Sequence, residues 1–158
     1  MTVRGLILLT GGALVACAAP VDLARGEAAV VYGEDDRREL FEAPPALAAI
    51  ARGASVALLD EGALVRTGDR YALPDTYTLG EAEGLCATER FTEQPTAAWC
   101  SGTLIAPDVV LTAGHCVPDA AACAATAFVF DYLYEAPGVL ATVDEADVYR
   151  CGALLLQR

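Results

Sequence analysis

Two short apolar runs rich in β-branched residues stand at residues 103–105 and 109–111, with Ala106, Pro107 and Asp108 between them. Pro107 fixes φ for a turn, and Asp108 can accept a local backbone hydrogen bond. Alternation of short apolar runs with turn residues is typical of paired strands. The pattern therefore predicts a β-hairpin at this point of the chain.

Further apolar runs predict strands at residues 28–32, 55–59, 63–65, 76–79, 128–130 and 148–149. Glu61-Gly62 is expected to turn the second of these runs into the third as another hairpin. The stretch 46–51, which follows Pro44-Pro45, is short and competent to form a helix. The polar segments at 67–83, 118–125 and 132–147 are expected to connect these elements on the surface.

Composition limits the range of functions. A chain of 158 residues has room for one domain. The ten basic residues are all arginine, and 22 acidic residues give a formal net charge of −12. A protein that binds nucleic acid needs a basic patch to neutralise phosphates, and the sequence contains none. Nucleic acid is therefore excluded as an expected partner.

Residues 1–16 have the composition of an export signal. A single charge at Arg4 precedes an apolar run from Leu6 to Val15, which is too short to span a bilayer. Leu14-Val15-Ala16-Cys17 resembles a bacterial lipobox, which implies cleavage before Cys17 and lipidation of that cysteine. Residues 17–26 are then a tether. Because Ala18 is not aspartate, the implied location is the outer membrane or cell surface; the alternative is an ordinary secretory signal.

Candidate chemistry centres on His115, the only histidine in the chain. Cys100 and Cys116 bracket the first predicted hairpin, and Cys116 directly follows His115. A disulfide between them would clamp the backbone that carries the imidazole. Two alternatives are a structural histidine and a zinc site. Zinc normally uses ligand pairs at C-x-x-C or H-x-x-x-H spacing, and neither spacing is present.

The residues Cys100-Ser101-Gly102, Leu104-Ile105 and Leu111-Thr112-Ala113-Gly114-His115-Cys116 resemble the trypsin-like serine peptidases, in particular their bacterial glutamyl-endopeptidase-like branch. The resemblance implies that His115 is the general base of a Ser-His-Asp triad and that Cys100 and Cys116 are bonded. It implies an all-β fold in which residues 27–158 form part of the first of two β-barrels. It also implies a polypeptide substrate and no cofactor or metal.

The other two members of the triad are not identifiable. The family places its aspartate in a D-x-A-L-L-type strand and its serine in G-D-S-G-G, and neither motif occurs here. Asp131, Asp144 and Asp147 follow His115 without that context and are not assigned. Three hypotheses remain: part of a serine endopeptidase, a non-catalytic lipid-anchored binding or structural protein, and a split enzyme completed by another chain. Substrate specificity does not follow from any of them.

The remaining cysteines suggest one further pair. Of the six cysteines, Cys17 is expected to be lipidated and Cys100 to pair with Cys116. Cys123 and Cys151 flank the strands predicted at 128–130 and 148–149, so their pairing is favoured if these strands lie side by side. One thiol is then expected to be left over.

Overall fold

The computed structural model describes residues 35–74 and 76–156. The export signal, the lipobox, the tether and the strand expected at 28–32 lie outside the described residues. The α-helices are α1 (Pro45–Ala54), α2 (Leu79–Glu83) and α3 (Ala120–Ala125), and short 3-10 turns occur at Leu40–Glu42, Glu61–Ala63 and Glu145–Asp147. The helix expected at 46–51 is thus confirmed as the central part of α1.

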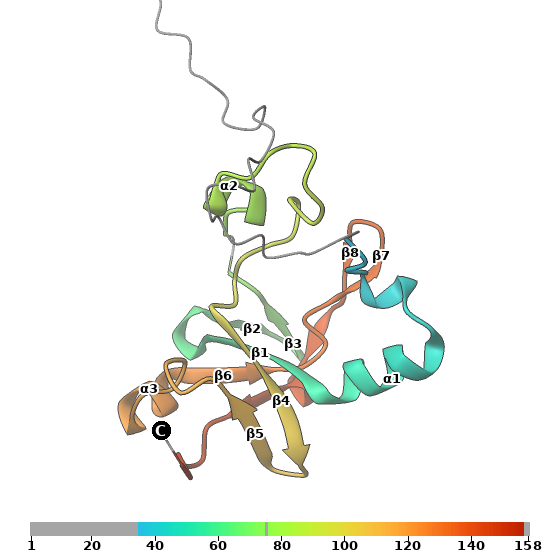
Figure 1. Cartoon of the computed structure of the whole chain (residues 1–158). Helices are drawn as coiled ribbons and strands as arrows, with labels where there is room; N and C mark the ends of the chain where they lie inside the picture. Colours follow the sequence, from blue (N-terminus) through green and yellow to red (C-terminus); the bar gives the residue numbers. More distant parts are fainter. Residues whose placement is uncertain (1–34, 75, 157–158) are drawn as a thin grey trace, which may run out of the picture.

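Within the described residues, ten β-strands make up most of the regular structure (Figure 1): β1 (Ser55–Asp60), β2 (Val65–Thr67), β3 (Arg70–Ala72), β4 (Cys100–Ala106), β5 (Val109–Thr112), β6 (Thr126–Val129), β7 (Tyr134–Ala136), β8 (Val139–Leu140), β9 (Val143–Asp144) and β10 (Val148–Arg150). The principal sheet has the order β10-β6-β1-β4-β5, and every pair in it is antiparallel. The strands expected at 128–130 and 148–149 are confirmed as the neighbours β6 and β10.

Strand β1 lies at the centre of this sheet and is buried on both faces. Side chains alternate across a strand, so Val56 and Leu58 point to one cluster of buried residues and Ala57 and Leu59 to another. The first cluster contains Cys116, Val117 and Cys123, and the second contains residues of β6, β9 and β10. Burial of Leu58 and Leu59, each 0% exposed, contributes about 1.5–3 kcal/mol apiece.

The hairpin expected between residues 55–59 and 63–65 is wrong. Asp60 caps a 3-10 turn instead, because its carboxylate accepts a hydrogen bond from the Gly62 amide at 2.9 Å. The chain consequently leaves the principal sheet, and β2 pairs with β3, which pairs with β9. A local side-chain cap has competed successfully with strand pairing.

Two other expectations fail for the same reason. Thr78 does not belong to a strand over 76–79 but begins α2, where the Thr78 and Glu81 side chains form a reciprocal capping box. The segment 118–125 is not a loop throughout, because Asp119 accepts a hydrogen bond from the Ala122 amide at 2.8 Å and starts α3. The alanine-rich sequence that follows favours a helix.

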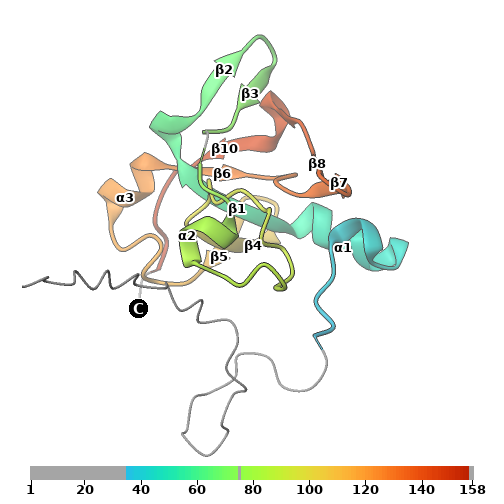
Figure 2. The same cartoon turned by 90° about the horizontal axis from the view of Figure 1, so that it is seen from above.

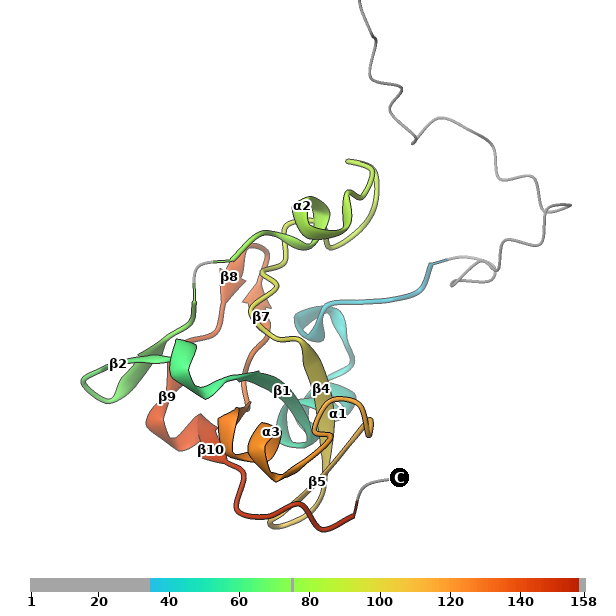
Figure 3. The same cartoon turned by 90° about the vertical axis from the view of Figure 1, so that its left-hand side faces the viewer.

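The principal sheet curls into half a barrel, with α1 and α3 beyond opposite ends of it (Figure 2). Helix α2 and its loop lie apart from the sheet, on the side away from β5 (Figure 3). The expected all-β fold with part of one β-barrel is therefore confirmed. None of the described helices is long and apolar enough to cross a membrane.

Gly102 provides a test of how closely the sheet is packed. A Cβ atom at this position would lie 2.7 Å from Val110 Cγ1 and 3.1 Å from the Leu111 carbonyl oxygen. We expect Gly102→Ala to lower the free energy of unfolding by about 1–3 kcal/mol, because backbone and β-branched neighbours must move. Urea denaturation measures the change. Gly152→Ala, where nothing lies within 4 Å, is the control, and an equal effect of both substitutions would contradict the packing account.

Candidate active site

The hairpin that precedes His115 has the predicted form. Strands β4 and β5 pair with Gly102 opposite Thr112 and Leu104 opposite Val110. The Thr112 hydroxyl also donates a hydrogen bond to the Ser101 carbonyl oxygen at 2.7 Å. This bond fixes the end of β5 against β4, three residues before His115.

His115 lies in a tight turn directly after β5. The Cys116 amide donates to the Ala113 carbonyl oxygen at 2.9 Å and closes this turn. Cys116 is buried, at 7% exposure, whereas His115 is exposed to solvent. Cys116 is thus anchored in the core while the adjacent His115 lies at the surface. The imidazole is therefore accessible to groups that do not belong to this turn.

The disulfide implied by the resemblance is present. Cys100 and Cys116 are bonded, with their Cα atoms 6.1 Å apart, and both sulfur atoms lie within 4.8 Å of a ring nitrogen of His115. The bond joins the start of β4 to the residue after His115. It therefore limits the movement of the turn that carries the imidazole.

The same cluster of Cys100, His115 and Cys116 meets the distance requirement for a metal site. Zinc, however, binds cysteine as the thiolate. The two sulfur atoms are joined to each other in a disulfide and carry no thiolate charge. The donor set in this oxidised state is thus reduced to one imidazole, which does not fit a zinc site.

The second favoured disulfide is also present. Cys123 of α3 and Cys151 after β10 are bonded, with a Cα separation of 5.4 Å. This position follows from the pairing of β6 with β10, which brings the two flanking segments together. The expectation of a leftover thiol is wrong for the described residues, because no cysteine among them is free. That count rested on removing Cys17, which lies outside the described residues.

The aspartates that follow His115 all have other partners in the structure. Asp119 caps α3, Asp131 pairs with Arg52 at 3.0 Å, and Asp144 lies 3.5 Å from Arg70. Asp147 accepts a hydrogen bond from the Asp144 amide at 2.8 Å. The contacts of Asp131, Asp144 and Asp147 thus give no reason to assign any of them as the triad aspartate.

Neither serine of the described residues is placed to act as the nucleophile of a triad with His115. The chain has two serines, Ser55 on β1 and Ser101 on β4. Within residues 35–74 and 76–156 no hydrogen bond or ion pair joins either of them to the His115 side chain. The structure accordingly positions one candidate catalytic group and not three.

A groove beside β4 was not anticipated from the sequence. Its volume is about 540 Å³, and its lining includes Leu40, Gln94, Trp99, Cys100 and Tyr132. The Tyr132 hydroxyl donates to the Pro95 carbonyl oxygen at 2.8 Å and accepts from the Ala97 amide at 3.3 Å, while burial raises the pKa of Tyr132. Trp99, the only tryptophan, is 49% exposed and lines this groove. Its position next to Cys100 is the one feature of the sequence that could have pointed to the groove.

Comparison with known families agrees with this geometry. The family model described as Trypsin matches residues 86–132, less than half of the chain. The matched segment includes β4, β5, His115 and the Cys100–Cys116 disulfide. Comparisons with curated proteins and with solved structures give no match. The match and the half-barrel support a trypsin-like protein with a partial trypsin-like barrel and, at family level, a serine-protease-like function.

The first disulfide makes a specific prediction. In the double variant Cys100→Ser/Cys116→Ser we expect the free energy of unfolding to fall by about 3 kcal/mol, because the loop it closes is 16 residues long. We also expect the turn that carries His115 to become more mobile. Nuclear magnetic resonance would detect this as a change in chemical shift and a smaller line width of the imidazole ring protons of the single histidine. Cys123→Ser/Cys151→Ser is the control. It should destabilise the fold comparably and leave the His115 signal in place; a histidine signal that responds equally to both would contradict the clamp.

Proposed function

We propose that this chain is the histidine-bearing part of a trypsin-like serine endopeptidase. The observation that carries the proposal is the exposed His115, held next to the Cys100–Cys116 disulfide in the turn after β5, inside the segment that matches the Trypsin family. A general base needs a fixed backbone and an open approach for its partner. The bonded turn provides the first and the solvent exposure provides the second.

In this proposal His115 accepts the proton of a serine hydroxyl as that oxygen attacks a peptide carbonyl. It later returns the proton to the leaving amine. An aspartate must hold the imidazole in the correct tautomer. Because Ser55, Ser101 and the aspartates that follow His115 make no hydrogen bond or ion pair with it, the serine and the aspartate come from other sequence, either of the same polypeptide or of a partner chain.

A second candidate function is a non-catalytic, lipid-anchored binding or structural protein derived from the peptidase fold. The observation that favours it is the His115 side chain, which makes no hydrogen bond or ion pair within the described part of the chain. In such a protein His115 needs no reactive serine as a partner. The two candidates therefore differ in whether the protein reacts with a probe for activated serines.

Labelling by a fluorophosphonate, which reacts with activated serines, tests the proposed function. The protein is captured with an antibody from cells that make it, as wild type, as His115→Ala and as the double variant Ser55→Ala/Ser101→Ala. We expect labelling of the wild type and of the serine variant, and loss of labelling in His115→Ala. Equal labelling of wild type and His115→Ala would contradict the role of His115, and no labelling of any form would favour the non-catalytic candidate.

The same proposal predicts the behaviour of this chain by itself. Residues 17–158 expressed alone are expected to show no peptidase activity on an unfolded protein substrate, because a base without a nucleophile cannot form an acyl-enzyme. The measurement compares the chain with its His115→Ala variant at equal concentration. Hydrolysis by the wild type that disappears in His115→Ala would show that the chain carries its own nucleophile.

We further propose that the protein is exported and anchored at a bacterial outer membrane or cell surface through a lipid on Cys17. The lipobox-like residues 14–17 after a short apolar run support this location. Cys17→Ser is expected to move the protein from the membrane fraction to the soluble fraction, with Ala18→Ser as control. A Cys17 side chain found by mass spectrometry in a disulfide and without lipid would contradict the anchor.

A further inference from the structure

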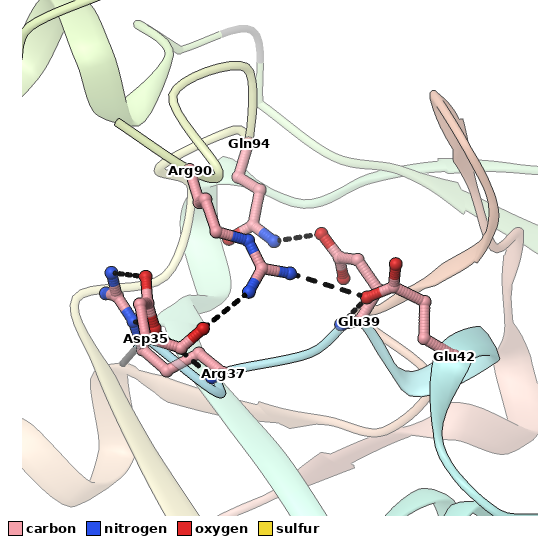
Figure 4. Close-up of polar contacts among 6 residues, drawn as sticks. All are labelled: Asp35, Arg37, Glu39, Glu42, Arg90 and Gln94. Carbon is pink, nitrogen blue, oxygen red and sulfur yellow. Dashed lines mark hydrogen bonds and ion pairs between the residues drawn. The ribbon is translucent and has the colours of Figure 1, made fainter. Parts of the chain in front are cut away.

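The segment Asp35–Glu42, here called the strap, lies against the loop at residues 89–94 (Figure 4). Three polar contacts join them although they are more than 45 residues apart in sequence. Gln94 Nε2 donates to Glu39 Oε1 at 2.6 Å, Arg90 Nη1 donates to the Asp35 carbonyl oxygen at 3.3 Å, and Arg90 Nη2 lies 3.6 Å from Glu42 Oε2. Arg90 thus holds both ends of the strap.

Hydrogen bonds within the strap fix the conformation in which it meets the loop. The Arg37 guanidinium donates to both carboxylate oxygens of Asp35, at 2.8 and 2.7 Å. These hydrogen bonds lower the pKa of Asp35 from 3.8 to about 2. The Glu39 amide donates to Glu42 Oε2 at 2.9 Å, so the carboxylate that meets Arg90 is also fixed by its own turn.

The loop under the strap contains a strained residue. Phe91 has φ of 68°, a left-handed conformation that a bulky side chain rarely adopts without support from its surroundings. Arg37 of the strap and Arg90 lie over its ring, with their Cζ atoms 5.4 and 4.7 Å from the ring centroid. The strap therefore contributes directly to holding the loop in this conformation.

The strap also forms one wall of the groove beside β4. Leu40, in the 3-10 turn of the strap, lines this groove together with Trp99, Cys100 and Ser101. Gln94, the partner of Glu39, lines it as well. Movement of the strap away from the loop would remove Leu40 from the wall and open the groove that Trp99 also lines.

We propose that the strap is a salt-releasable latch that closes the groove beside Trp99 and holds the loop that leads into β4. Its ionic contacts are exposed: the Arg90 and Glu42 side chains are 40% and 43% accessible to solvent. Such contacts weaken as salt screens them, because the Debye length falls from about 10 Å at 0.1 M to about 3 Å at 1 M.

The single tryptophan makes the latch observable in the full chain. We expect acrylamide, a neutral quencher, to quench Trp99 fluorescence at least about 1.5-fold more strongly near 1 M salt than near 0.05 M. Arg90→Gln should show the stronger quenching at both salt concentrations. Arg66→Gln is the matched control, because it removes another exposed ion pair, Arg66 to Glu145 at 2.6 Å, with side chains 53% and 55% accessible, on the distant strand β2. It should behave as the wild type does.

A second variant keeps the test decisive if Arg90→Gln fails to fold by circular dichroism. Phe91→Gly removes the ring on which both arginines lie, and glycine accepts the left-handed backbone without strain. This variant should keep the loop and release the strap, giving strong quenching at low salt. Salt-independent quenching in the wild type, weak quenching in Phe91→Gly, or the same response in Arg66→Gln and Arg90→Gln would each overturn the latch.

Discussion

Burial of strand β1 on both of its faces is the constraint on which the rest of the structure depends. Its central side chains divide between two clusters, and the strand pairs with β4 on one edge and β6 on the other. A strand in this position needs apolar residues at consecutive places, as Val56 to Leu59 provide. Both halves of the principal sheet are therefore built outward from this one strand.

The Cys100–Cys116 disulfide fixes the candidate active site to the packed core around β1. Cys116 packs in the cluster on one face of β1, and the adjacent His115 projects into solvent. The turn that presents the imidazole is consequently fixed on both sides, by β5 before it and by the bonded cysteine after it. The second disulfide, between α3 and the segment after β10, packs against the same cluster, so both crosslinks reinforce one face of the sheet.

How far the sequence predicted the structure depended on the range of the interactions. The hairpin before His115 was predicted because the apolar runs and Pro107 carry a strong local signal. The Cys100–Cys116 disulfide was implied by the family resemblance, and the Cys123–Cys151 disulfide by two strands expected to lie side by side. Errors at 61–65, 76–79 and 118–125 arose where Asp60, Thr78 and Asp119 cap turns or helices, and a cap is hard to distinguish from a polar loop residue. The strap and the groove depend on contacts between distant segments, which no local pattern encodes.

The most direct measurement of the central claim is the mass of the native protein that carries a fluorophosphonate label. The account predicts a labelled species heavier than the 16.4 kDa of this chain, or a labelled partner captured with it, with the label mapped by peptide mass spectrometry to a serine other than Ser55 and Ser101. Such a result makes His115 the base for a nucleophile supplied from elsewhere. An unlabelled product with the mass of residues 17–158 and their lipid would contradict the account and direct the search toward a binding function.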